Sequence, residues 1–99
     1  MAVAGCRWCA FWLQVEPYYK DDRMVIVRDI DSGEYRMRVL AVWREHRPAG
    51  SLGAEEMRHL RDRLIYVMET VLQLRPEHYE INGSACFDRR HEHIWGCVL

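Results

Sequence analysis

Two cysteines near the amino terminus have the spacing of a metal-binding pair. Cys6 and Cys9 are separated by two residues, which allows both thiolates to bind one tetrahedral metal ion. The carboxyl-terminal segment adds further nitrogen donors at His91 and His93. A zinc site formed by Cys6, Cys9, His91 and His93 is therefore one hypothesis that the sequence supports.

A simpler interpretation of the cysteines competes with the zinc site. Cysteine is among the most frequently buried residue types, so Cys9, Cys86 and Cys97 can serve as small core side chains. Zinc modules usually repeat a short-spaced pair, whereas the second pair here is two histidines separated by a single residue. We therefore expect no bound metal and no cofactor, and keep the zinc site as an alternative.

Residues for nucleophilic catalysis are present but lack a motif. Cys86 or Ser84 would need a histidine base such as His91 or His93 beside it. No nucleophile elbow, phosphate-binding glycine loop or paired-carboxylate motif accompanies them. The sequence therefore predicts a protein that is not an enzyme.

Arginines on one predicted strand suggest a nucleic-acid surface as a second alternative. Arg36, Arg38 and Arg44 share one face of the segment 34–44, and Arg28 lies on the preceding strand. However, 14 basic and 15 acidic residues give a formal net charge of −1, so no overall attraction to phosphate backbones is expected.

The first half of the chain predicts strands. Aromatic and β-branched residues are enriched in three segments, which are 8–15, 23–30 and 34–44. Gly33 can close a tight hairpin between the second and third of these segments. In segment 34–44, Val39, Ala41 and Trp43 share one face while Leu40 and Val42 share the other.

A long amphipathic helix follows. From Met57 through Leu60 and Leu64, apolar residues recur every three or four positions, which predicts one continuous helix over 54–74. Ser51 or Gly53 can cap its amino end, and Pro76 ends it.

Two pairings are possible for the final strands. Segments 84–87 and 93–98 could form a hairpin across the polar residues 88–92. Alternatively, a turn at Asn82 and Gly83 could pair 78–81 with 84–87. In both cases the chain predicts a single α+β domain over 1–99, with an antiparallel sheet of about five strands in the order β-β-β-α-β-β and one helix packed on one face.

The aromatic surplus leads to the functional hypothesis. One helix, about 10 Å across, cannot cover a five-stranded sheet, so we expect an aromatic-rich face that is bare in the monomer. The sequence thus predicts a non-enzymatic protein-interaction module, an adaptor or regulatory protein that forms a homodimer or binds a protein partner. The expected partner-binding residues are Trp8, Trp12, Leu40, Val42 and Trp43.

The location follows from the cysteines and from the absence of membrane signals. The sequence has no apolar segment long enough to cross a membrane and no recognisable export signal, so no membrane association is expected. Thiols then persist in a reducing compartment, which predicts an intracellular protein, cytoplasmic or nuclear.

Overall fold

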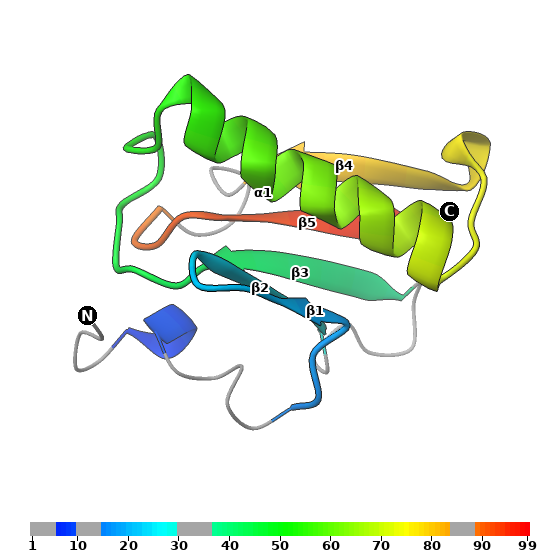
Figure 1. Cartoon of the computed structure of the whole chain (residues 1–99), viewed down its shortest axis with the longest axis horizontal. Coiled ribbons are helices and arrows are strands. Elements are labelled where there is room, and N and C mark those ends of the chain that lie inside the picture. The colour runs from blue at the N-terminus through cyan, green and yellow to red at the C-terminus, as the bar shows by residue number, and fades with distance from the viewer. Residues whose placement is uncertain (1–5, 10–14, 30–36, 84–88) are drawn as a thin grey trace.

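Five strands and one long helix make up the computed structural model, which describes residues 6–9, 15–29, 37–83 and 89–99 (Figure 1). The strands are β1 (Tyr19–Lys20), β2 (Met24–Arg28), β3 (Arg38–Trp43), β4 (Tyr79–Gly83) and β5 (His93–Val98). The helical segments are η1 (Arg7–Cys9), α1 (Ala54–Tyr66), η3 (Val67–Val71) and η4 (Pro76–His78). No helix among the described residues is long and apolar enough to cross a membrane.

The strands form one antiparallel sheet in the order β1-β2-β3-β5-β4. The central strand β3 pairs with β2 on one side and with β5 on the other, so β5 enters the sheet beside a strand that lies far away in sequence. Its pairing places Val42 opposite His93 and Leu40 opposite Trp95. The predicted fold class, an α+β fold with a five-stranded antiparallel sheet and one helix, is confirmed.

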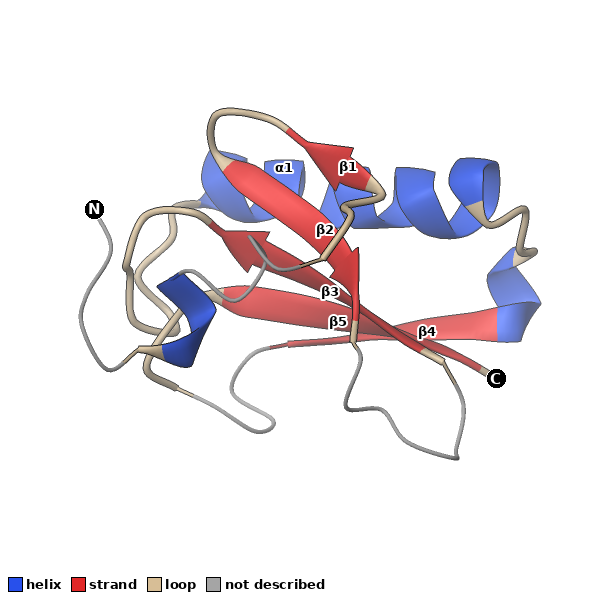
Figure 2. Cartoon of the chain, turned by 90° about the horizontal axis from the view of Figure 1, so that it is seen from below, coloured by secondary structure: helices blue, strands red, loops and turns tan. Residues whose placement is uncertain are grey.

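Alternating side chains give the sheet two apolar faces. Val39, Ala41 and Trp43 point to the face that α1 covers, where Leu60 and Leu64 complete the larger core. Leu40 and Val42 point to the opposite face, where they pack with Val25, Val27 and Trp8. Figure 2 shows α1 on one side of the sheet and η1 on the other. The amino-terminal turn therefore contributes cover to the face that the helix leaves bare.

The helix is shorter and less regular than its periodicity predicts. It begins after Gly53, whose backbone N–H donates to the side chain of Glu56 at 2.9 Å, and it continues beyond Tyr66 as the π-helical segment η3. Leu72 N–H bonds to the carbonyl of Val67, and Gln73 takes a left-handed conformation with φ of 57°. A left-handed residue ends a helix, so this one stops before the expected position 74.

Several predicted strand boundaries are wrong. Residues 7–9, at the start of the predicted strand 8–15, form a 3-10 turn, residues 10–14 lie outside the described residues, and the first strand among the described residues is β1 at Tyr19. The last hairpin pairs β4 with β5, so it matches neither expected pairing. The predicted turn at Gly33 and the segment 84–87 lie outside the described residues.

Candidate metal centre and adjoining histidine

The amino-terminal cysteines are brought together by a single turn. In η1, the backbone N–H of Cys9 donates to the carbonyl of Cys6 at 3.3 Å. This turn places two thiols, spaced by two residues, on the same side of the backbone. Cys9 is buried and Cys6 is half-buried, so both sulfur atoms lie at the sheet and not in open solvent.

Two histidines from later in the chain, His46 and His91, lie beside these thiols. His46 follows the end of β3, and His91 precedes β5. Backbone hydrogen bonds join these two loops, from Trp43 N–H to Glu92 O at 3.0 Å and from Glu92 N–H to Arg47 O at 2.6 Å. The pairing of β3 with β5 thus fixes both imidazoles, whose ring centres lie 5.2 Å apart.

Three sulfur–nitrogen distances among the four donors are close to those of a tetrahedral metal site. The Cys6 Sγ to His91 Nδ1 distance is 3.5 Å, Cys9 Sγ to His46 Nδ1 is 3.3 Å, and Cys9 Sγ to His91 Nδ1 is 3.7 Å. Zinc–sulfur bonds of about 2.3 Å and zinc–nitrogen bonds of about 2.0 Å give a sulfur–nitrogen edge of roughly 3.5 Å in a tetrahedron. All four donors lie within 4.8 Å of one another. The four side chains are therefore grouped closely enough to be candidate ligands of one metal ion.

The orientation of His91 prepares it for this role. Its Nε2 lies 2.5 Å from the carbonyl oxygen of Trp43, and a carbonyl can only accept, so Nε2 carries the proton. The lone pair of the neutral ring is then on Nδ1, the atom that faces both sulfurs. Metal-binding histidines typically have such a backbone partner on the other nitrogen, because it fixes the tautomer and the ring plane.

The ionisation of Cys6 depends on its surroundings. Burial raises the pKa of the Cys6 thiol, and the adjacent Cys9 sulfur raises it further, although the backbone N–H of Trp8 opposes both effects. The Cys6 thiol therefore stays protonated at neutral pH unless a cation stabilises its thiolate. A divalent ion would do so and would release protons on binding.

A second histidine on β5 lies directly beside this cluster. His93 Nδ1 is 2.8 Å from the carbonyl oxygen of His91, which again makes Nδ1 the donor and leaves the lone pair on Nε2. The indole of Trp8 stacks on the His93 ring, with the ring centres 3.9 Å apart and an angle of 18° between the planes. Both residues are buried, at 1% exposure for Trp8 and 0% for His93.

The structure assembles a donor set that differs from the expected one in one residue. Cys6, Cys9 and His91 come together as the zinc hypothesis requires, but the fourth donor is His46, and His93 turns toward Trp8. The sequence could not identify His46, because it lies in a loop 37 positions from Cys9 and no short-spaced motif contains it. Cys97 lies on β5 and is not part of this donor set.

The expected partner-binding residues do not form a bare surface. Trp8, Leu40, Val42 and Trp43 are each at most 3% exposed within the single chain, and Trp12 lies outside the described residues. Trp43 belongs to the core under α1, whereas the other three pack on the opposite face. Self-association stays a prediction, but these buried side chains cannot mediate it in the folded chain.

The arginines expected to bind nucleic acid are largely engaged within the chain. Arg38 forms an ion pair with the buried Asp29 at 2.8 Å, and its guanidinium lies over the Trp95 ring. Arg44 donates to the backbone carbonyl of Asp21 at 2.7 Å. Arg28 is exposed, and Arg36 lies outside the described residues. The described part of the chain therefore shows no continuous basic stripe.

Comparison with known proteins identifies the fold. No family model matches the sequence, and no curated protein matches it either. Among solved structures, a histidine triad protein from Clostridium difficile superposes with a TM-score of 0.76 at 15% identity, covering 100% of this chain and 94% of that one. An HIT family hydrolase from Clostridium thermocellum gives a TM-score of 0.73 at 18% identity, covering 98% and 91%. An HIT family hydrolase from Legionella pneumophila gives 0.69 at 15% identity, covering 93% and 90%.

These similarities show that the chain has the fold of the HIT structures over nearly its full length. They also correct the functional hypothesis. The prediction of a non-enzymatic interaction module is contradicted, because solved structures of the same fold are named hydrolases. The expectation of no enzyme fails for the same reason. It was based on the absence of a contiguous motif, whereas the candidate site is assembled from segments that the sheet brings together.

Proposed function

We propose that this chain is a hydrolase whose site is held in shape by a structural metal ion, and that His93 Nε2 is its reacting nitrogen. The observation that carries the proposal is the paired arrangement of His91 and His93 at the start of β5. One ring faces the two thiols through Nδ1, and the other has its lone pair on Nε2. The fold shared with HIT family hydrolases from Clostridium thermocellum and Legionella pneumophila supports the assignment.

The number of donors determines what the metal does. Catalytic zinc sites usually have three protein ligands and keep a fourth position for water, whereas structural sites are closed by four. Cys6, Cys9, His46 and His91 supply four. The ion would therefore connect η1 to the loops around β3 and β5, and the chemistry would fall to a side chain.

His93 is suited to that chemistry by its tautomer. An imidazole whose Nδ1 is held by a carbonyl presents a fixed Nε2 lone pair, which can attack an electrophilic centre or take a proton from water. In either role the bond to the leaving group breaks. Water finally supplies a hydroxyl to one product and a proton to the other.

The metal centre and His93 are mechanically connected. Trp8 lies between the two cysteine ligands in sequence, and its indole covers the His93 ring. Substrate access to a ring with no exposed area requires a change in what covers it. Thiolate ligation is compatible with a reducing compartment, so we place the protein inside the cell.

The test uses zinc-loaded protein and a panel of chromogenic substrates, p-nitrophenyl acetate, p-nitrophenyl phosphate and bis-p-nitrophenyl phosphate. We expect turnover of at least one substrate and a loss of about 100-fold or more in His93→Gln, the usual cost of removing a base or nucleophile. His78→Ala is the control, since His78 is exposed and distant in the fold, and it should leave the rate unchanged. Turnover that persists in His93→Gln, or no turnover of any substrate, contradicts the proposal.

A further inference from the structure

A pocket lies on the face of the sheet opposite His93. It has a volume of about 620 Å³ and is bounded by α1, β4, β5 and the loop at Gly50. Side chains alternate along β5, so Ile94 points into the core under α1 whereas His93 contacts Trp8 on the other face. The pocket is therefore separate from the proposed hydrolytic site.

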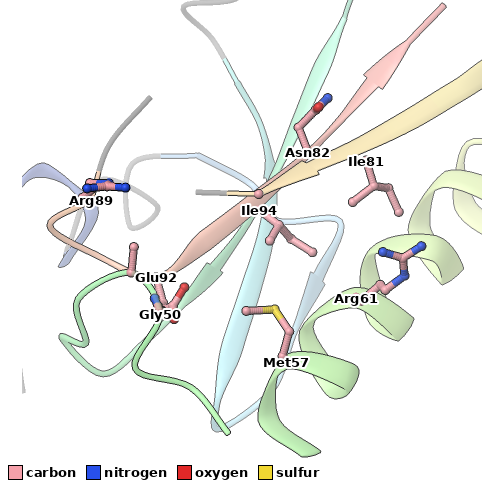
Figure 3. Close-up of a pocket in the computed structure, with 10 residues that line it drawn as sticks. Gly50, Met57, Arg61, Ile81, Asn82, Arg89, Glu92 and Ile94 are labelled. Carbon is pink, nitrogen blue, oxygen red and sulfur yellow. Dashed lines mark hydrogen bonds between the residues drawn. The ribbon is translucent and has the colours of Figure 1, made fainter. Parts of the chain in front are cut away.

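The middle of this pocket is apolar. Figure 3 shows Met57 from α1, Ile81 from β4 and Ile94 from β5 pointing toward a common space. Ligand sites in proteins typically have volumes of 300 to 1,000 Å³ and combine an apolar lining with a few polar groups. This pocket meets both criteria.

Its charged groups favour an anion at one end. Arg61 on α1 and Arg89 before β5 line the pocket from opposite ends (Figure 3), and both are exposed. No ion pair or side-chain hydrogen bond joins either guanidinium to a described residue. The charge of Arg61 acts on Tyr79: burial and Glu69 raise the pKa of Tyr79, and Arg61 lowers it in part.

Glu92 adds a negative charge to the lining and so limits the charge and the position of an anionic ligand. Its carboxylate is buried and accepts hydrogen bonds from the backbone N–H groups of Gly50 at 2.8 Å and Leu52 at 3.2 Å. With Arg61 and Arg89, the lining carries a formal charge of +1. Because Glu92 lies toward the Arg89 end, an anionic group meets the least repulsion at Arg61 (Figure 3).

We propose that this pocket binds a small amphiphilic monoanion, with its charged group on Arg61 and its apolar part against Met57, Ile81 and Ile94. The guanidinium pairs with a carboxylate or another singly charged oxyanion through two parallel hydrogen bonds. The apolar part removes the three side chains from water. The ligand is thus an organic acid, and it binds independently of the chemistry at His93.

The test uses zinc-loaded protein with 8-anilinonaphthalene-1-sulfonate, a fluorescent monoanion, and follows the methyl resonances of Ile81 and Ile94. We expect saturable binding that shifts both resonances. Octanoate should displace the probe, whereas octylammonium, which has the same chain and the opposite charge, should not. Arg61→Glu should weaken binding by about tenfold, equivalent to about 1.4 kcal/mol. The matched control is Arg58→Glu, an exposed arginine on the same helix outside the pocket, which should have no effect.

A second variant keeps the test decisive if Arg61→Glu is unstable. Gly83 lines the pocket, and a Cβ atom built on it meets no atom within 4 Å. Gly83→Leu should therefore fold normally and reduce probe binding by filling the pocket. Equal displacement by octanoate and octylammonium, or unchanged binding in both Gly83→Leu and Arg61→Glu, overturns the proposal. Neither result depends on whether His93 hydrolyses a substrate.

Discussion

The indole of Trp8 lies parallel to the imidazole of His93, 3.9 Å between ring centres and 18° between planes, and Trp8 belongs to the turn that carries both cysteine donors. The turn that carries the two cysteine donors therefore also carries the side chain that covers the His93 ring. A metal ion bound to Cys6 and Cys9 would fix the chain on either side of the indole. The stack thus couples the ordering of the amino-terminal turn to the exposure of His93.

Removing the indole should expose His93 to reagents. We expect Trp8→Ala to accelerate carbethoxylation of His93 by diethyl pyrocarbonate by about tenfold, because loss of the stack removes cover worth about 1.4 kcal/mol. Mass spectrometry of the modified peptide measures the rate at this site. Trp8→Leu is the companion variant, since it keeps the apolar cover if alanine unfolds the turn, and it should give an intermediate rate. Equal rates in all three proteins would show that the indole does not protect the ring.

Metal content should distinguish between the two possible donor sets. His46→Ala removes a donor whose Nδ1 is 3.3 Å from Cys9 Sγ, so we expect it to lose most bound zinc and to unfold at a lower temperature. His93→Ala should retain one zinc per chain, since His93 hydrogen bonds to the His91 carbonyl and is not a donor. Elemental analysis after gel filtration measures both. Zinc lost from His93→Ala and retained in His46→Ala would restore the set expected from the sequence.

Local patterns in the sequence predicted the long helix and the strands β2, β3 and β5, but they did not predict how the segments assemble. The spacing of Leu60 and Leu64 places them on one helix face, and the alternation of Ala41 and Val42 assigns them to opposite sides of a sheet, because both patterns depend only on local geometry. The contact between His46 and Cys9 depends instead on the order of strands, which no local pattern encodes.

Trp8 illustrates an error in the type of element predicted. Aromatic and β-branched composition favoured a strand over 8–15, but at its first two residues a backbone hydrogen bond from Cys9 to Cys6 closes a turn. That turn places Trp8 against the sheet as a separate covering group. A strand would have continued the sheet and left the face bare, which is why the sequence suggested an interaction surface that the chain itself covers.

Acid should destabilise the fold partly through Asp21. Burial alone would raise the pKa of this carboxyl, but hydrogen bonds from the Tyr19 hydroxyl, from the amides of Arg23 and Met24, and from His59 outweigh it and lower the pKa to about 2. The folded-state pKa thus lies below the unfolded value of 3.8. The resulting stabilisation is present above pH 4 and is lost as the pH falls toward 2, and after solvent screening it amounts to about 1 kcal/mol.

Asp21→Asn isolates this contribution. The variant should be less stable than the wild type by about 1 kcal/mol at pH 7, and the difference should become small near pH 2, where about half of the wild-type Asp21 carboxyls are neutral. Urea unfolding at both pH values measures it. Acid-sensitive groups that do not contact Asp21, including the metal donors, are common to both proteins and cancel in the difference. A gap that stays constant from pH 7 to pH 2 would show that the carboxylate charge is not its source.

Because η3 packs closely on β5, we expect a methyl group added at Gly96 to destabilise the fold. A Cβ atom on Gly96 would lie 3.0 Å from Met68 Sδ and 3.1 Å from Met68 Cε, and Met68 has no exposed area. The thioether must move within a filled core, so Gly96→Ala should cost about 1 kcal/mol of unfolding free energy. Gly83→Ala is the matched control on the adjacent strand β4, where a Cβ atom meets nothing within 4 Å, and it should be neutral or slightly stabilising.

Shortening the methionine should relieve this overlap. Met68→Val leaves a space on its own, but in combination with Gly96→Ala the added methyl group enters the volume that the thioether vacates. We therefore expect the double variant to be more stable than the sum of the two single effects, by about 0.5 kcal/mol or more. Urea unfolding of the four proteins completes the cycle. Strictly additive effects would mean that Gly96 and Met68 do not touch in the folded chain.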